Sequence, residues 1–196
     1  MKFILQILTL FFLTLIIQSC ATFPKKSANQ LRLTEHNLTR INGKYKVKPV
    51  KDSLLDKDLT VYHNAFEKFY RGKGRGSKDT MKIDNFDNYT FEIKLIEKKQ
   101  IEVNYLKDNI SFRKFKLKYE LKADGYVYLK NKNLKVSGVP YLFGSIDIKK
   151  LRLSIIGNYL TVEEIRHSSG AILFIFGDSK TWHYNDKYVR TEKNAL

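Results

Sequence analysis

Apolar and charged residues alternate along much of the chain after residue 88. The clearest stretch is 115–121, where Phe115, Leu117 and Tyr119 are separated by lysines. Alternation with a period of two places apolar side chains on one face of a β-strand and charged side chains on the other. Comparable apolar runs bounded by turn signals predict strands at 45–47, 89–95, 101–105, 115–121, 126–129, 134–136, 151–155, 160–165, 171–176 and 181–184.

Short turn signals separate these predicted strands. Asp124-Gly125 and Gly157-Asn158 are compact pairs of the kind that join antiparallel neighbours. Residues 98–99, 167–170 and 177–179 are interpreted as turns as well. Links this short favour a mainly β fold, an antiparallel meander that closes into a barrel or sandwich and so hides its edge strands.

A different period appears near the start of the predicted domain, at 59–71. Its large apolar residues recur at the spacing of one face of a helix: Leu59, Tyr62, Phe66 and Phe69. Asp58 stands where a helix cap belongs, and Gly72 stands where a helix ends. The pattern predicts one amphipathic helix.

The first nineteen residues form a segment of their own. Lys2 precedes an almost wholly apolar run at 3–17. This run is shorter than the about 20 residues that a membrane-spanning helix needs. A charged start followed by a short apolar run is typical of an export signal.

Residues 15–20, Leu-Ile-Ile-Gln-Ser-Cys, resemble the lipobox of bacterial lipoproteins. The resemblance implies cleavage between Ser19 and Cys20, followed by lipidation of Cys20 with a diacylglycerol and acylation of the new amino terminus. Several acyl chains anchor a protein stably in a membrane. Cys20 is also the only cysteine, as suits an exported chain without a disulfide. By analogy, Ala21 in place of an aspartate favours the outer membrane. No acidic cluster of the kind that some phyla use as a surface-export tag follows Cys20, so the periplasmic face is expected.

These signals divide the chain into an export signal at 1–19, a lipidated cysteine with a polar tether at 20–37, and a single β-rich domain at 38–196. The formal net charge is +16, which suits nucleic acid, an anionic membrane surface or an anionic ligand. Nucleic acid is excluded as a partner because an exported protein does not meet the chromosome. Attraction to anionic lipid and a merely lysine-rich solvated surface both remain open.

The start of the predicted domain resembles that of lipocalins. That family opens with an apolar residue, a turn and a Gly-x-Trp motif, and here Ile41, Gly43 and Tyr45 give a version with tyrosine for tryptophan. In lipocalins an arginine near the chain end packs over that ring, and Arg190 is the candidate here by position. The family's central Thr-Asp-Tyr motif is absent. The resemblance implies a cup-shaped barrel and identifies no ligand.

Residues able to carry catalysis or hold a metal form no recognisable constellation. The four histidines stand far apart, without the spacing of a zinc site: His36, His63, His167 and His183. Gly177-Asp178-Ser179 is similar to the nucleophile block of an esterase family, but it falls between late strands. Glu163 and Glu164 are adjacent in a strand and therefore face opposite sides. No catalytic residue, metal ligand or cofactor is assigned.

Two tripeptides resemble the O-glycosylation sequon that some Gram-negative phyla use on exported proteins. They are Asp52-Ser53-Leu54 and Asp79-Thr80-Met81, which makes Ser53 and Thr80 candidate modification sites. Both stand in predicted loops or at element ends, as a modified residue needs.

Two functions stay open at this point. The first is a tethered, non-enzymatic binding module that holds a lipid or another hydrophobic or anionic ligand in its barrel. The second is a structural or assembly lipoprotein that docks another envelope component, which an exposed sheet would favour over a closed cup. An enzyme ranks last because no nucleophile and base can be paired.

Overall fold

The computed structural model of the chain describes residues 22–23, 31–50, 64–69, 85–97, 99–130, 134–139, 143–172 and 176–191. The export signal and the cleavage and lipidation site at Ser19 and Cys20 lie outside these residues, as do Ser53 and Thr80. They stay predictions.

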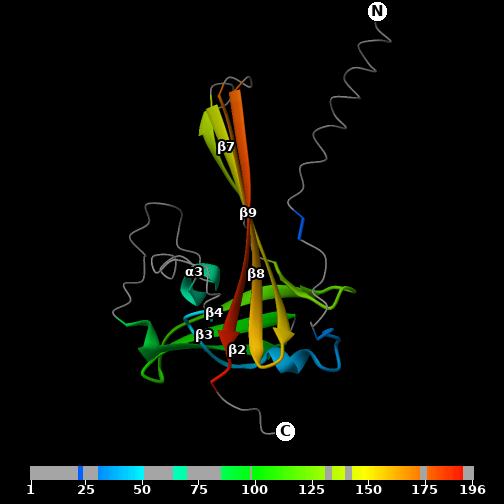
Figure 1. The fold of residues 1–196 in the computed structure, drawn as a ribbon, viewed down its shortest axis with the longest axis vertical. Helices are drawn as coiled ribbons and strands as arrows, with labels where there is room; N and C mark the ends of the chain where they lie inside the picture. The colour runs from blue at the N-terminus through cyan, green and yellow to red at the C-terminus, as the bar shows by residue number, and fades with distance from the viewer. Residues whose placement is uncertain are drawn as a thin grey trace, which may run out of the picture.

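The described residues form one curled antiparallel sheet of nine strands (Figure 1). Neighbours follow the order β1-β2-β3-β4-β5-β7-β8-β9, and β6 pairs with β7 beside this path. The order is that of a meander, so the predicted mainly β, antiparallel fold is confirmed. The strands are β1 (Gly43–Lys46), β2 (Tyr89–Ile96), β3 (Gln100–Lys107), β4 (Ile110–Leu121), β5 (Val127–Leu129), β6 (Leu134–Val139), β7 (Phe143–Ile156), β8 (Tyr159–Ile172) and β9 (Phe176–Val189).

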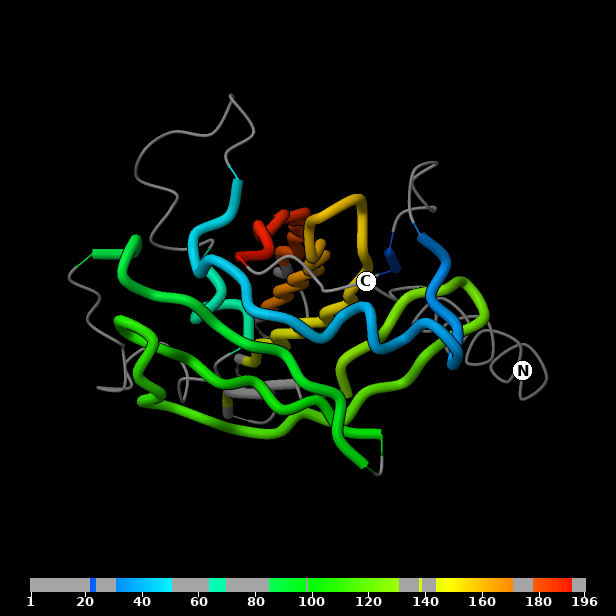
Figure 2. The backbone as a smooth tube through the Cα atoms, turned by 90° about the horizontal axis from the view of Figure 1, so that it is seen from below, coloured from blue at the N-terminus to red at the C-terminus, as the bar shows by residue number. Residues whose placement is uncertain are grey.

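The sheet curls into a half-barrel whose first and last strands meet. Tyr45 in β1 forms an isolated antiparallel bridge with Arg190, directly after β9. Next to it, the backbone N–H of Thr191 donates to the carbonyl of Lys44 at 2.8 Å. Figure 2 views the molecule along its long axis, with β2, β3 and β4 in green curving beside the end-on β7, β8 and β9. The bridge pairs part of the two edges that an open sheet would expose.

Strands β7, β8 and β9 are each 14 residues long, much longer than predicted. Their outer halves project away from the remaining strands (Figure 1). Their inner halves supply buried residues to the rest of the domain. All described residues outside the projection are called the body. This projection is called the β-arm here. It consists of 134–139 in β6, 143–148 in β7, 167–172 in β8 and 176–181 in β9.

Two predicted turns lie inside the β-arm, and both predictions are wrong. Residues 167–170 belong to β8 and residues 177–179 to β9, with Ser169 paired to Ser179. Glycine and serine favour turns locally, but here the ladders from β7 and β9 hold β8 extended on both sides. The residues predicted as one strand at 171–176 belong to two strands, because Ile172 ends β8 and pairs with Phe176 at the start of β9. Residues 173–175 lie outside the described residues.

The predicted helix at 59–71 is interrupted. Helix α3 covers only Ala65–Phe69, and the preceding Asn64 caps it, since the side-chain oxygen of Asn64 accepts the backbone N–H of Glu67 at 3.1 Å. The prediction of a continuous helix capped by Asp58 is therefore wrong at Asn64, while residues 59–63 and 70–71 lie outside the described residues. The described residues also include two short 3₁₀ helices, η1 (Leu38–Ile41) and η3 (Phe86–Asn88).

Aromatic side chains fill the interior of the half-barrel. Tyr45, Phe91, Tyr105 and Tyr188 are each 0% exposed. The ring of Phe91 lies 5.5 Å from that of Tyr45 and 5.4 Å from that of Tyr188, centroid to centroid. Phe66 of α3 adds a ring 4.4 Å from that of Tyr105. Close ring packing of this kind leaves the centre of the body occupied by its own side chains.

The segment before η1 packs against the same body and contributes Leu33 to its core. Leu31 bridges Ile155 in β7, and Leu33 is 2% exposed. Further back, the ring of Phe23 lies 5.6 Å from the ring of Tyr128. Part of the stretch expected to serve as a tether thus contacts the domain directly.

Candidate functional site

A group of charges around a buried ion pair lies where the β-arm leaves the aromatic core. Helix α3, β7, β8 and β9 each contribute to it. It is called the interior charge cluster, and its members are Lys68, Lys149, Glu164, Arg166 and Asp186.

Lys68 sits between two carboxylates inside the body. Its Nζ atom lies 2.6 Å from Oε2 of Glu164 and 2.7 Å from Oδ2 of Asp186. The side chains of Lys68 and Glu164 are 1% and 0% exposed, so water does not screen this pair. The ammonium also lies 4.7 Å from the centre of the Tyr184 ring, as in a cation–π contact. A lysine held in this way is an ion-pair partner rather than a nucleophile.

Glu164 is the centre of the interior charge cluster. Its second oxygen, Oε1, lies 3.4 Å from Nζ of Lys149 and accepts a hydrogen bond from Arg166. Burial alone would raise the pKa of this carboxyl, but Lys149, Lys68 and Arg166 outweigh burial and lower the pKa to about 2. Glu164 therefore carries its charge throughout the physiological pH range.

The surroundings disfavour the charged form of Lys149, whereas they favour that of Glu164. Burial lowers the pKa of Lys149 to about 8, since the attraction of Glu164 does not outweigh desolvation and the repulsion from Arg166 and Lys68. Its ammonium donates a hydrogen bond to the backbone carbonyl of Glu67 at 2.7 Å. Lys149 thus ties β7 to α3.

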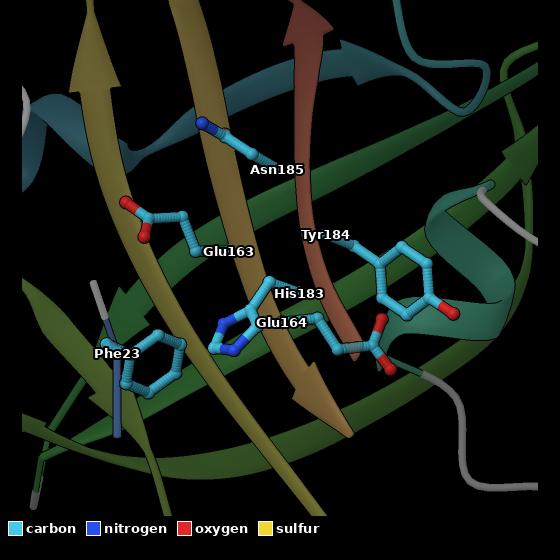
Figure 3. Close-up of a pocket in the computed structure, with 6 residues that line it drawn as sticks. All are labelled: Phe23, Glu163, Glu164, His183, Tyr184 and Asn185. Carbon is cyan, nitrogen blue, oxygen red and sulfur yellow. The ribbon is translucent and has the colours of Figure 1, made fainter. Parts of the chain in front are cut away.

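A small cavity straddles β8 and β9 beside this cluster (Figure 3). Its volume is about 90 Å³, against roughly 300–1,000 Å³ for the pockets that hold drug-sized ligands. Figure 3 shows Glu163 with His183 on one side of the strands and Glu164 with Tyr184 on the other, beside α3. The two adjacent glutamates therefore do not form a carboxylate pair, as the strand alternation predicts.

Glu163 belongs to a different ion pair on the outer face of the sheet. Nη2 of Arg152 lies 2.5 Å from Oε2 of Glu163. The guanidinium of Arg152 stacks 3.7 Å from the centre of the Tyr126 ring and 4.4 Å from that of Phe23. Arg152 is 3% exposed, so the segment around Phe23 helps to cover a second buried charge.

Arg190 closes the half-barrel at its lower end. Its guanidinium donates to the carbonyl of Asn42 at 2.8 Å, to the carbonyl of Arg40 at 2.5 Å and to the hydroxyl of Tyr45 at 2.8 Å. Burial raises the pKa of the Tyr45 hydroxyl to about 12 even though Arg190 acts to lower it. Gly43 makes room for this contact, since a Cβ atom there would lie 2.9 Å from Nη1 of Arg190. The structure thus places Arg190 over Tyr45, at the positions that carry the lipocalin resemblance.

The three histidines that the structure describes do not come together. Nδ1 of His167 lies 2.8 Å from Oγ1 of Thr181 in the β-arm, His183 lines the cavity and His36 is exposed. His63 lies outside the described residues. Within the described ranges, no three His, Cys, Asp or Glu side chains are grouped as a metal ion would need. The same part of the chain contains no helix long and apolar enough to cross a membrane.

The sequence interpretation missed every member of the interior charge cluster as a site residue. Glu164 is considered there only as a neighbour of Glu163, and Lys68 falls on the polar face of the predicted helix, where a lysine is expected to face solvent. The sequence does contain one signal for Glu164. In a strand, Glu164 shares a face with Leu160 and Val162, which point into the core, so the alternation places a charge on the apolar face.

The chain matches no family model, no curated protein and no solved structure. The lipobox and lipocalin resemblances therefore remain expectations from the sequence.

Proposed function

We propose that this chain is a lipid-anchored envelope lipoprotein that works by docking another envelope component rather than by carrying a ligand. Residues 15–20 support the anchor, because they combine an export signal with a cysteine at its end. The acylated Cys20 would hold the domain at a membrane. The expected membrane is the outer membrane, with the domain on its periplasmic side.

The observation that carries the docking role is the packed interior of the half-barrel. A carrier of lipid needs an apolar cavity of several hundred Å³. Here Tyr45, Phe91, Tyr105 and Tyr188 fill the centre, and the interior charge cluster lies above them. Burying a lipid tail against Lys68, Glu164 and Asp186 would place hydrocarbon beside charges, which is unfavourable. The interior therefore supports a rigid scaffold more than a cup.

The outside of the domain offers extended surface instead. Strand β4 alternates half-buried and exposed residues, with Lys114, Lys116 and Lys118 on its outer face. The β-arm extends beyond the body as a long ribbon (Figure 1). An exposed sheet and a projecting ribbon are features of proteins that bind other macromolecules through their surface.

Native mass spectrometry separates the docking role from ligand carriage. The chain beginning at Ala21 keeps every described residue and omits the anchored cysteine. We expect this chain, exported to the periplasm behind a cleavable signal, to be recovered with the mass of the polypeptide alone. A reproducible additional mass that organic solvent removes would contradict the docking role and identify a carried ligand.

The anchor is tested separately in the full-length chain. We expect radiolabelled palmitate to be incorporated into the wild-type protein and to be absent from the Cys20→Ala variant. Labelling that persists in Cys20→Ala would contradict the lipid anchor.

A further inference from the structure

Strand β4 is 12 residues long, but only its last part has a strand on both sides. Strand β3 pairs with residues 110–118 of β4, whereas β5 pairs only with residues 119–121. Among the described strands, none lies along the other edge of residues 110–117. In Figure 2, β4 is the outermost of the green strands. Residues 113–117, where the pairing with β3 is regular, are called the open edge here.

Two hydrogen bonds near the end of β4 show which way its backbone groups point. The N–H of Tyr119 donates at 3.0 Å to the residue before β3, whereas the carbonyl of Lys118 accepts at 2.7 Å from the residue after β5. Successive residues of a strand direct these groups to opposite edges. The N–H and C=O of Lys114 and Lys116 therefore point out of the open edge, where no described residue bonds them. Such unpaired groups form a template for a further strand.

The inner face of the open edge is incompletely covered. In the register of the sheet, Phe115 lies beside Val103, and Leu117 lies beside Ile101. Val103 and Ile101 are each 1% exposed, whereas Phe115 and Leu117 are only half-buried although they pack against the same core. Phe115 and Leu117 have a neighbouring strand on one side only. Apolar side chains of an added strand would complete both rows.

The outer face of the same segment is basic. Exposed lysines alternate along it, namely Lys114, Lys116 and Lys118. The three positions of β3 that face them contain one acidic residue, Glu102, whose Oε1 lies 3.3 Å from Nζ of Lys114. Glu120, the next residue on this face, is paired with Lys130. The other two lysines thus have no acidic partner among the described residues.

We propose that the open edge binds an extended strand of a partner protein in which acidic residues alternate with apolar ones. The backbone of that strand pairs with the outward groups of Lys114 and Lys116, as in recognition by strand addition. Its acidic residues stand opposite these lysines, with Cβ atoms about 4.5–5.5 Å apart. Its apolar residues continue the rows of Phe115 and Leu117. The inference rests on the proposed docking role and deepens it by naming a site and a class of partner.

A second copy of this chain does not fit the open edge. Two such edges paired with each other would place Lys114 and Lys116 of one copy against lysines of the other, because all of them lie on the outer face. Like charges directly opposite each other destabilise a sheet, and edge lysines hinder self-association. The formal net charge of +16 repels a second copy further and attracts an acidic partner.

A pair of synthetic peptides tests the charge preference. The chain beginning at Ala21 contains all nine described strands and the complete aromatic core, and circular dichroism checks its fold. The probe is a fluorescent peptide of about seven residues that alternates glutamate with valine, long enough to span the open edge. We expect it to bind at least about tenfold more tightly than the same peptide with lysine for glutamate, as measured by fluorescence anisotropy.

Equal affinities for the two peptides, or no binding of the glutamate peptide, would overturn the inference. If that result accompanies a native mass equal to that of the bare polypeptide, the docking role stands and its partner binds elsewhere on the surface.

Methylated peptides distinguish strand pairing from attraction between charges. Residues opposite Lys114 and Lys116 exchange hydrogen bonds with them, so the glutamate nitrogens of the probe point to β4 and the valine nitrogens point away. Methylation of the glutamate nitrogens should abolish binding, whereas methylation of the valine nitrogens should preserve it, although both peptides keep the same charge. Equal binding by the two methylated peptides would overturn strand addition.

A charge reversal locates the site on the protein. Lys116→Glu should weaken binding of the glutamate peptide at least about tenfold and strengthen binding of the lysine peptide. Lys46→Glu is the matched control, because Lys46 is exposed in β1, three strands from the open edge, and its replacement changes the net charge equally. Equal effects of the two variants would overturn the inference, since binding would then follow the net charge of the chain rather than the open edge.

Discussion

Nζ of Lys68 lies 2.6 Å from Oε2 of Glu164, although the two residues are 96 positions apart in the sequence. The contact joins α3 to the middle of β8, inside the body and next to the base of the β-arm. Its two charges are removed from water, so its energetics differ from those of the ion pairs on the surface. Several measurable properties of the protein depend on this arrangement.

Lys68→Met should strongly destabilise the domain. The variant keeps the volume of the side chain but leaves Glu164 and Asp186 without the ammonium that both carboxylates contact. Breaking a buried pair in this way typically costs about 3–5 kcal/mol in the free energy of unfolding. Urea unfolding followed by circular dichroism measures the loss.

The exposed pair of Lys130 and Glu120 supplies the control for Lys68→Met. Nζ of Lys130 lies 3.1 Å from Oε2 of Glu120, with the two side chains 56% and 47% exposed. Lys130→Met should change the free energy of unfolding by at most about 1 kcal/mol. Should Lys68→Met prove too unstable to purify, Asp186→Asn removes one of the two carboxylate charges and is expected to lose less. Equal effects of Lys68→Met and Lys130→Met would contradict the buried pair.

Acid should weaken the fold through Glu164. Lys149, Lys68 and Arg166 outweigh burial and lower the pKa of Glu164 from 4.5 to about 2. A carboxyl with a depressed pKa in the folded state contributes stability that is present above pH 4.5. That contribution, on the order of 3 kcal/mol, is lost as the pH falls toward 2. In urea titrations, the advantage of wild type over Glu164→Gln should therefore shrink steadily between about pH 5 and pH 2.

The comparison with Glu164→Gln isolates this titration from that of other carboxyls. The variant retains every other acidic group, so acid effects elsewhere appear equally in both proteins. A constant difference between the two proteins across this pH range would show that Glu164 does not titrate with a depressed pKa.

Most strands of the body can be predicted from local patterns, because their apolar and polar residues alternate. Phe115, Leu117 and Tyr119 alternate with lysines, and β4 contains them all. The β-arm could not be predicted in this way. Its serines and glycines at 167–170 favour turns locally, and only pairing with neighbours on both sides keeps them extended.

The interior charge cluster could not be predicted from the sequence, for a different reason. Its members come from α3, β7, β8 and β9, and no spacing in the chain relates Lys68 to Glu164 or Asp186. Their meeting depends on the register of the strands and on where α3 docks. By contrast, the lipocalin resemblance predicts that Arg190 lies over the ring of Tyr45, as it does in the structure. A family resemblance contains information about contacts between distant residues, which local patterns lack.

Arg190→Met should open the closure between β1 and the end of β9. The variant leaves the carbonyls of Arg40 and Asn42 and the hydroxyl of Tyr45 without the guanidinium that donates to them. Partly buried acceptors that lose their donor cost about 2–4 kcal/mol together. The midpoint of urea unfolding measures this loss. Lys187→Met, at an exposed position of β9, should leave the midpoint nearly unchanged, and equal midpoints in the two variants would argue against a closing role for Arg190.

Amide hydrogen exchange should be slow in one half of β8 and faster in the other, although β8 is one continuous strand of 14 residues. Around Val162 the strand is fully buried, so its amides should exchange only when the whole body unfolds. Around Ser169 the same strand is paired on both sides but contacts no aromatic core, and we expect local opening to expose those amides at much lower free energy. Exchange followed by mass spectrometry of peptides from the two halves measures the difference. Equal protection along the strand would mean that the β-arm and the body unfold as one cooperative unit.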